Sequence, residues 1–318
     1  MATTFPQRAP VAQRPWLTPA RREAINGWLF ALPWLFGLLI FTAGPMIFSL
    51  YASFTRYNIT TAPQWIGIQN YREIMDDPFF WKALYNTFWM VIVKTPLVIL
   101  FSLSIALLLN LDLPGEKFFR SIIYFPNVLS GIAAVFLWMW ILAPNGLLNR
   151  GLDFLGIQGP GWFVDPSWTK PGMVVMGMWW IGGNILIYLA ALKGIPRTLY
   201  EAAEIDGAGG WAKTFSITLP LLTPAIFFEL ITNIIGAFQI FTTAYIISGT
   251  NAPTGGPGQS MLFYVLYLYS RAFGQVGPAG FQMGYASALA WILFLIILAV
   301  TLIQLSLANR WVYYESEE

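Results

Sequence analysis

Long apolar stretches are the feature that most constrains how this chain can fold. A helix needs about 20 mostly apolar residues to cross the hydrocarbon layer, because its backbone must satisfy its own hydrogen bonds where there is no water. Stretches of this kind lie at 28–54, 83–111, 121–143, 172–192, 225–248 and 281–308. The sequence therefore predicts an all-α polytopic membrane protein with six transmembrane helices. A further apolar run, 261–269, is too short to span and fits an interfacial or re-entrant segment.

The composition narrows the class of protein further. Of the 318 residues, 57% are hydrophobic and 10% are charged, whereas soluble domains carry roughly a quarter charged residues. The sequence has no Cys and no His, so only carboxylates remain as metal ligands. A net charge of +2 without a basic, aromatic-rich cluster gives no reason to expect a nucleic-acid partner. No Gly-x-x-x-x-Gly-Lys-[Ser/Thr] loop is present, so we expect no nucleotide, cofactor or metal in this chain and no enzymatic activity.

Lys and Arg set the expected orientation, because they are retained on the cytoplasmic side of a membrane. With the N-terminus inside, the inner segments carry ten of these residues and the outer segments carry six. The first apolar stretch follows a 27-residue polar lead and is too long for the core of a cleaved signal peptide. We therefore expect a cytoplasmic tail at 1–27, one membrane domain at 28–308 and a second cytoplasmic tail at 309–318.

The inner loop at 195–224 contains the most specific pattern. Thr198 and Glu201 have the spacing of a capping box, in which each side chain satisfies a free amide at the start of a helix. Gly207 favours the positive φ angle of a helix end and turn. A second short helix would then be closed by Pro220, whose ring does not fit inside a helix. The loop is thus predicted to form a helix-turn-helix outside the bilayer.

The residues of this loop resemble the signature loop of binding-protein-dependent ABC importer permeases. The matching positions are Glu201, Ala202, Ala203, Gly207, Ile217, Thr218, Leu219 and Pro220. The resemblance extends over nearly the whole chain, including the turn at 144–149 and the stretch at 284–290. Within the family the chain resembles the carbohydrate-uptake branch of maltose, lactose and glycerol-phosphate type, and there the first permease subunit of a heterodimeric pair. The resemblance implies a type I ABC importer-like permease fold in the cytoplasmic membrane of a bacterium or archaeon.

The resemblance also implies that the loop is a coupling helix that docks on a cytoplasmic ATPase. Glu201 and Asp206 would be its polar contacts. Gly207 would give the turn, while Leu219 and Pro220 would anchor the loop against the membrane helices. The plainer alternative is an ordinary amphipathic connector.

The partners that the resemblance implies are a second permease subunit, two ATPase subunits and an external solute-binding protein. The ATPase subunits would bind ATP and Mg²⁺, because this chain lacks the phosphate-binding loop. The outer loops at 145–171 and 249–280 are the expected docking surface for the solute-binding protein.

Polar residues inside the fourth and fifth apolar stretches suggest a substrate path. They are Asn184, Tyr188, Thr232, Asn233, Gly236, Gln239 and Thr243. Those of the fifth stretch, apart from Asn233, recur every three or four residues, which places them on one helical face. Polar groups inside a membrane usually face the bundle interior or a wet cavity. Because small and polar residues also hold membrane helices together, both roles stay open.

Lys94 and Glu229 lie inside two of the apolar stretches. They could form an ion pair, although residue counting puts them at different depths. The other interpretation is that Lys94 snorkels and that Glu229 is exposed to water at the inner end of its span. Neither residue belongs to the family signature, so the sequence assigns neither a transport role.

Hydroxyl, amide and aromatic groups along the path suit a sugar, and the lack of an Arg or Lys cluster favours an uncharged one. The chain has no extra N-terminal spans and no large outer domain, which departs from the maltose type and leaves mono-, di- and oligosaccharides open. A permease for glycerol phosphate or another polyol is the alternative. A secondary transporter would show paired interrupted helices with coupling charges, which are not evident in the sequence. A membrane-embedded enzyme is disfavoured by the missing His and Cys.

Overall fold

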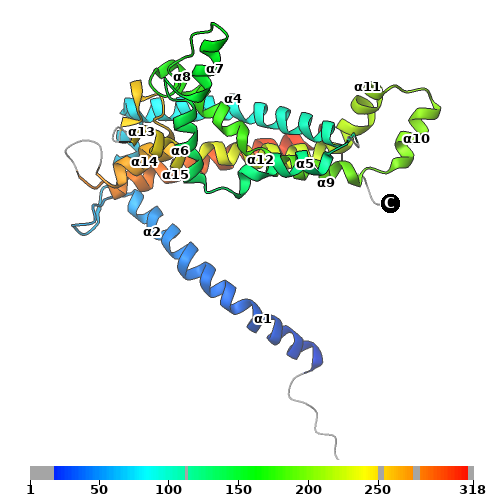
Figure 1. The fold of residues 1–318 in the computed structure, drawn as a ribbon. Helices are drawn as coiled ribbons and strands as arrows, with labels where there is room; N and C mark the ends of the chain where they lie inside the picture. The colour runs from blue at the N-terminus through cyan, green and yellow to red at the C-terminus, as the bar shows by residue number, and fades with distance from the viewer. Residues whose placement is uncertain (1–17, 112–113, 250–253, 275–279, 314–318) are drawn as a thin grey trace, which may run out of the picture. The chain divides into compact units, whose positions relative to one another are not determined.

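The computed structural model describes residues 18–111, 114–249, 254–274 and 280–313. These residues are mostly helical (Figure 1). They separate into two compact units, residues 1–51 and 52–318, and each unit is described by itself.

The first unit is a continuous apolar helix. α1 (Pro19–Gly37) runs through the π-helical η1 (Leu38–Ala43) into α2 (Gly44–Ser53). The wider π turn comes just before Pro45, whose missing N–H and bulky ring disfavour a regular α turn. The helix begins inside the predicted tail 1–27, of which residues 1–17 lie outside the described part of the chain.

The second unit opens with a short antiparallel hairpin of β1 (Thr55–Arg56) and β2 (Gln64–Trp65). The α-helices that follow are α3 (Gln69–Asp76), α4 (Pro78–Leu109), α5 (Glu116–Tyr124), α6 (Gly131–Ile141), α7 (Leu147–Phe154), α8 (Pro166–Gly177), α9 (Gly182–Gly194), α10 (Arg197–Ile205), α11 (Gly210–Lys213), α12 (Leu219–Phe238), α13 (Thr242–Ser248), α14 (Tyr264–Ala272) and α15 (Met283–Ala308). Short 3-10 or π segments connect them at η2 (Phe125–Val128), η3 (Met178–Trp180), η4 (Thr214–Thr218) and η6 (Pro257–Gln259).

Among the described residues, four helical segments are by themselves long and apolar enough to cross a membrane: 20–53, 78–109, 210–248 and 283–308. Two more spans are formed only if bent pairs are counted, α5 and η2 with α6 at 104°, and α8 and η3 with α9 at 48°. The chain therefore has four to six candidate spans. The expectation that 121–143 and 172–192 form uninterrupted helices is wrong.

Local sequence explains both bends. Pro126 has no amide hydrogen to donate, and the chain becomes extended at Leu129 (ψ 147°) before α6 begins. At the second bend Gly182 lies so close to the end of α5 that an added Cβ would stand 2.6 Å from the carbonyl oxygen of Ile123. Only glycine permits this approach. The two bends consequently pack on each other.

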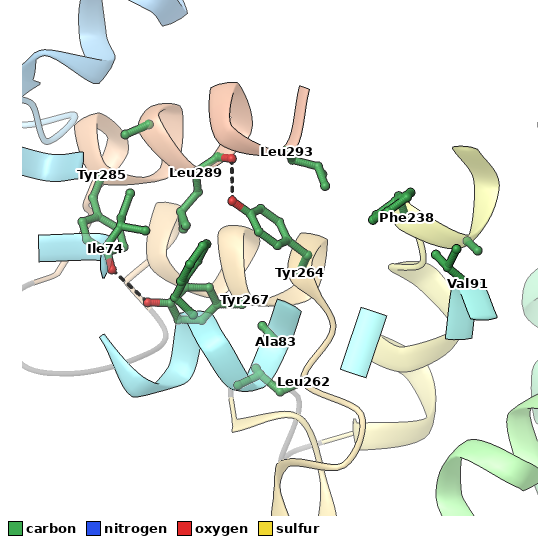
Figure 2. Close-up of a cluster of buried hydrophobic side chains, with 13 residues drawn as sticks. Ile74, Ala83, Val91, Phe238, Leu262, Tyr264, Tyr267, Tyr285, Leu289 and Leu293 are labelled. Atoms are coloured by element: carbon green, nitrogen blue, oxygen red, sulfur yellow. Dashed lines mark hydrogen bonds between the residues drawn. The ribbon is translucent and has the colours of Figure 1, made fainter. Parts of the chain in front are cut away.

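α4 is the centre of the second unit. Figure 2 shows the cluster that joins it to α14 and α15, in which Ala83, Leu262 and Leu289 surround the aromatic rings. The hydroxyl of the buried Tyr264 donates to the carbonyl of Leu289 (2.9 Å). The segment predicted as interfacial or re-entrant, 261–269, mostly lies in α14, which is too short to span, as expected. Its buried residues are divided between this cluster and a second one that contains Met261, Phe263 and Leu266.

The other half of α4 packs against α9 and α12. Val98 and Ala106 of α4 share a buried cluster with Ile185 of α9 and Leu222 of α12. The predicted fourth and fifth spans therefore lie against the same helix. This places the polar residues of three segments, distant in sequence, around one space.

Candidate functional site

The loop at 195–224 forms α10 and α11 at one end of the second unit, while α7, α13 and α14 lie toward the other end (Figure 1). The predicted helix-turn-helix is confirmed. The predicted capping box is wrong, because α10 begins at Arg197 with Pro196 as its N-cap and no side chain bonds to its free amides. The fixed φ of Pro196 starts the helix before Thr198, which leaves that residue inside the first turn.

Gly207 ends α10, as predicted, with a φ of +78°. The amide of Ala208 donates to the carbonyl of Ala203 (2.8 Å), and the amide of Gly207 donates to that of Glu204 (3.0 Å). This pair of bonds is the Schellman motif, in which the residue of positive φ is usually glycine. Gly207 therefore fixes the direction in which the chain leaves α10.

The prediction that Pro220 closes the second helix is wrong. α11 continues through η4 into α12, and Pro220 lies at the very start of α12. The π turn of η4 comes just before Pro220, whose missing N–H and bulky ring disfavour a regular α turn. Ile217 and Leu219 are half-buried and pack against the cluster that joins α4, α9 and α12. The loop thus leads directly into a membrane helix.

Two polar contacts tie α10 to the segment after the turn. The Lys213 ammonium donates to the Glu204 carboxylate (2.7 Å), and the hydroxyls of Tyr200 and Thr218 are 2.9 Å apart. The hydrogen bond and the charge of Lys213 lower the pKa of Glu204, so this carboxylate stays ionised at neutral pH. These contacts hold the two helical pieces of the loop as one body.

The tip of the loop presents an accessible surface. Its signature residues are exposed or half-buried: Glu201, Ala202, Ala203, Asp206 and Gly207. Ile205 is 88% exposed and Trp211 is 79% exposed. Trp211 also stacks on the ring of Phe215, with centroids 6.0 Å apart. Large exposed apolar side chains gathered with charged ones are typical of a docking surface.

A cavity of about 420 Å³ lies between α4, α9 and α12. The predicted path residues Asn184, Thr232, Asn233 and Gly236 line it. The lining also contains residues that the path prediction did not include: Lys94, Thr95, Asn127, Trp180, Gly183, Ile187, Glu229 and Ala237. Four of these residues lie in other segments: Lys94 and Thr95 in α4, Asn127 in η2 and Trp180 in η3. Periodicity within one helix could not assign them to the path, since tertiary packing brings them to the cavity.

Glu229 is buried in the wall of this cavity. Its side chain is 2% exposed, so the expectation that it is water-exposed at the end of its span is wrong. Its carboxylate accepts a hydrogen bond from the amide of Asn233 (2.8 Å) and another from the amide of Asn184. The second bond joins α9 to α12 through two polar residues. In the described part of the chain, no ion pair links Glu229 to Lys94.

Three of the predicted path residues do not line the cavity: Tyr188, Gln239 and Thr243. Tyr188 is fully buried in the hydrophobic cluster of α4, α9 and α12. α12 ends at Phe238, and the backbone breaks before α13 begins at Thr242, so the predicted single stripe is wrong beyond Gly236. The buried ring of Phe238 packs edge-on against Phe88 of α4 at the point where α12 ends. The polar residues beyond this point therefore do not continue the helical face on which Thr232 and Gly236 lie.

A second polar cluster lies at the end of the unit opposite to α10. Arg271 of α14 forms an ion pair with Asp77 (2.6 Å), and the hydroxyl of Tyr285 donates to the same carboxylate (2.9 Å). Tyr267 also donates to it. Burial alone would raise the pKa of Asp77, but the hydrogen bonds from two tyrosines and one backbone amide, with the charge of Arg271, lower it. Burial raises the pKa of Tyr267 to about 12.

The predicted docking loops lie toward the same end. The loop at 145–171 contains α7 and the beginning of α8. Within it the amide of Asn149 donates to the carbonyls of Pro144 and Pro160, each at 3.1 Å, and its oxygen accepts from the indole of Trp162 (2.9 Å). The loop is therefore tied into a fixed shape. Of the loop at 249–280, residues 250–253 and 275–279 lie outside the described part of the chain.

Together these features define a class, a multi-helix membrane protein with a polar cavity among its helices and an exposed helix-turn-helix at one end. The family described as binding-protein-dependent transport system inner membrane component matches residues 98–313. The chain belongs to this family and is a multi-pass permease subunit of an ABC transporter. Such subunits are not enzymes themselves, because ATP is hydrolysed by separate subunits.

Similar proteins align over nearly the whole chain. The probable ABC transporter permease protein YesP of Bacillus subtilis is 41% identical over 94% of this chain and 95% of its own length. The lactose transport system permease protein LacF of Rhizobium radiobacter is 34% identical over 90% and 95% of the two chains. A solved bacterial ABC transporter that imports alginate has the same fold, with a TM-score of 0.77 at 23% identity, covering 91% of this chain and 96% of that one.

Proposed function

We propose that this chain is one of two different permease subunits of an importer that moves a sugar across the cytoplasmic membrane. The observation that carries the proposal is the direct continuity between the exposed loop and α12, because α12 also forms a wall of the polar cavity. A displacement applied at the loop would therefore reach the substrate path through one helix. Relatives named for lactose and for arabinooligosaccharides support a sugar as the substrate.

The proposed topology has six spans with both termini in the cytoplasm. Four spans are the single helical segments 20–53, 78–109, 210–248 and 283–308, and counting each bent pair as one span supplies the other two. The excess of Lys and Arg in the segments assigned to the inside supports the orientation. The membrane domain would then be 28–308, with tails at 1–27 and 309–318. Residues 314–318 lie outside the described part of the chain.

The proposed partner at the inner end is a pair of ATPase subunits that bind ATP and Mg²⁺. Glu201 and Asp206 are exposed at the tip of the loop and would make polar contacts in a cleft of the ATPase. Ile205 and Trp211 would supply apolar contact area. Since the turn at Gly207 and the part-buried contact between Tyr200 and Thr218 hold the loop as one body, closure of the ATPase would move it as a unit.

The proposed partner at the outer end is a solute-binding protein that delivers the sugar. A fold neighbour of this chain, the alginate transporter, has been solved with a periplasmic protein carrying an alginate pentasaccharide. The loop at 145–171 offers exposed apolar side chains for such a contact, Phe154 being 90% exposed. A second permease subunit would complete the pore.

In the proposed cavity, Asn184, Asn233 and Thr232 present amide and hydroxyl groups to the sugar. The amides of the two asparagines are positioned by the Glu229 carboxylate, which accepts a hydrogen bond from each of them. Trp180 adds an apolar ring of the kind that packs on the faces of sugar rings. The alternative substrate is glycerol phosphate or another polyol, for which the 30% identical permease UgpA of Pectobacterium atrosepticum is the supporting relative.

The proposal is tested by reconstituting this chain in lipid with the permease, ATPase and solute-binding protein encoded beside it. ATPase activity is measured while sugars and polyols are added one at a time. We expect stimulation by one class of sugar and loss of that stimulation with Glu201→Lys, while the variant still inserts and assembles. If no ATPase associates with the chain, the importer assignment fails. Stimulation by glycerol phosphate alone would establish the polyol alternative.

A further inference from the structure

Lys94 is the one cation that lines the cavity among the described residues. It lies in the middle of α4, inside a membrane-spanning segment. Gly177 of α8 makes room for it, since a Cβ on that glycine would stand 3.0 Å from Lys94 Cε. The side chain is thus seated between α4 and the bend that follows α8.

The environment of Lys94 supplies no counter-charge of its own. Among the described residues no carboxylate lies within ion-pair distance of its ammonium, and no protein group accepts a hydrogen bond from it. Glu229 lines the same cavity, but its carboxylate is already bonded to Asn184 and Asn233. An ammonium inside a membrane is costly without a partner, and such groups usually mark a substrate or ion pathway.

We propose that Lys94 selects sugars that carry a carboxylate, and that the ammonium pairs with this carboxylate as the sugar passes through the cavity. This inference rests on the proposed function and names the substrate class of the same cavity. The hydroxyls of the sugar would bond to Asn184, Thr232 and Asn233, which line the cavity together with Lys94. This proposal replaces the expectation of an uncharged sugar. That expectation was drawn from the polar residues of the predicted path, and their periodicity along α12 could not show that Lys94 of α4 lines the same cavity.

The cavity suits a carboxylate better than a phosphate. A phosphate monoester carries close to two negative charges at neutral pH and is bound most strongly by the forked donors of several arginines. Here a single ammonium shares the cavity with the Glu229 carboxylate, and no arginine lines it. A group with one negative charge can pair with Lys94 while meeting less repulsion from Glu229. Uronic acid units of an oligosaccharide have this chemistry.

The experiment uses the assembled permease and ATPase subunits in lipid and matched pairs of oligosaccharides, one containing uronic acid units and the other its carboxyl-reduced, neutral counterpart. Binding is measured by calorimetry to the assembled permease and ATPase subunits without the solute-binding protein, so that the selectivity of that protein does not enter. The variants are Lys94→Met, Lys94→Arg and, as a matched control on the same helix but outside the cavity, Lys82→Met.

We expect Lys94→Met to weaken binding of the acidic oligosaccharide by about 10- to 100-fold, the usual value of a hydrogen bond to a charged group. Binding of the neutral counterpart should change less than about twofold. Lys94→Arg should retain most of the preference, and Lys82→Met should behave as the unaltered protein. Gly177→Ala, which crowds the Lys94 side chain without removing its charge, should weaken acidic binding by a smaller factor.

Other outcomes separate the two proposals. If neutral sugars bind and the Lys94→Met variant binds both members of each pair as the unaltered protein does, the role of Lys94 is wrong and the sugar importer stands. If a phosphorylated polyol binds and depends on Lys94, the carboxylate assignment is wrong. If no sugar of either kind binds or stimulates ATPase activity, the proposed function itself fails.

Discussion

The loop at 195–224 and the membrane cavity differ in how their residues are brought together. The loop is contiguous in sequence, and its shape depends on local bonds such as the turn at Gly207 and the contact between Glu204 and Lys213. The cavity takes Lys94 from α4, Asn184 from α9 and further residues from α12. Under the proposed function, the loop transmits a displacement, and its shape is specified within one segment. Under the same proposal, the cavity opens to each side of the membrane in turn, and it is built between separate helices.

This difference separates the effects expected from substitution. Changes in the loop should abolish coupling between ATP hydrolysis and transport for every substrate, since the loop itself makes no contact with the substrate. Changes in the cavity should alter which substrate is accepted while the ATPase stays attached. The predictions below test this separation, from the largest expected effect to the smallest.

Gly207→Pro should abolish transport. Proline requires a φ near −65°, whereas Gly207 has a φ of +78°, so the Schellman turn cannot form. We expect sugar uptake in proteoliposomes to fall at least 100-fold, with sugar binding to the cavity unchanged. Gly210→Pro is the matched control, because Gly210 is the first residue of α11, where proline is tolerated. Equal losses in both variants would show that the turn at Gly207 has no special role.

Asn184→Leu should reduce sugar affinity by about tenfold, the value of one or two lost hydrogen bonds. The substitution removes the amide that joins α9 to Glu229. Basal ATPase activity and association with the ATPase subunits should persist, because the loop is unaltered. The measurement is the sugar concentration that gives half-maximal stimulation. If the Asn184→Leu variant lost basal ATPase activity as well as sugar affinity, the cavity and the loop would not have the separate roles proposed for them.

Asp77→Asn should destabilise the end opposite to the loop without affecting sugar preference. The substitution leaves the Arg271 guanidinium, which is 17% exposed, without its charge partner. We expect the free energy of unfolding to fall by about 2–3 kcal/mol. Thermal unfolding in detergent measures it, with the exposed neighbouring Asp76→Asn as the control. A change of sugar preference without loss of stability would contradict this purely structural role.

The same cluster predicts a dependence of stability on pH. The folded-state pKa of Asp77 lies below the ordinary value of 3.8. A carboxyl with a lowered pKa stabilises the folded state above its unfolded pKa, and this contribution is lost as the pH falls through the folded value. We expect unfolding to be more sensitive to pH below about 4 in the unaltered protein than in Asp77→Asn. Parallel pH profiles of the two proteins would contradict the lowered pKa.

Glu204→Gln should have the smallest effect. The carboxylate is exposed, and surface ion pairs contribute little because water and salt screen them. We expect transport to stay within about twofold of the unaltered protein. Reconstituted uptake at low and high salt measures the effect. A large loss would mean that the carboxylate contacts the ATPase directly instead of only bracing the loop.

The loop was largely predictable from sequence because its signals are local. The positive φ of Gly207 and the helix-turn-helix followed from residue types alone. The errors in the loop are also local: Pro196 starts α10 in place of the predicted capping box, and Pro220 begins a helix instead of ending one.

The cavity was predictable only in part, since tertiary packing decides which polar residues share a space. Periodicity along the fifth stretch predicted that Thr232 and Gly236 lie on the path, and both line the cavity. Tyr188 is instead part of the hydrophobic core. The packing of Phe238 on Phe88 and the close approach of Gly182 to Ile123 join segments that are distant in sequence, so no single stretch of sequence records them. The bend at Pro126 has a local cause.

The most direct test of the account is cross-linking from single cysteines, which is clean because the chain contains no Cys. Ile205→Cys at the loop tip and Phe154→Cys in α7 are both at highly exposed positions. The account predicts that the first cross-links to the ATPase subunit and is shielded from an impermeant thiol reagent added outside intact cells, while the second is labelled by that reagent and never reaches the ATPase. Labelling of Ile205→Cys from outside, or ATPase cross-links from Phe154→Cys, would contradict it.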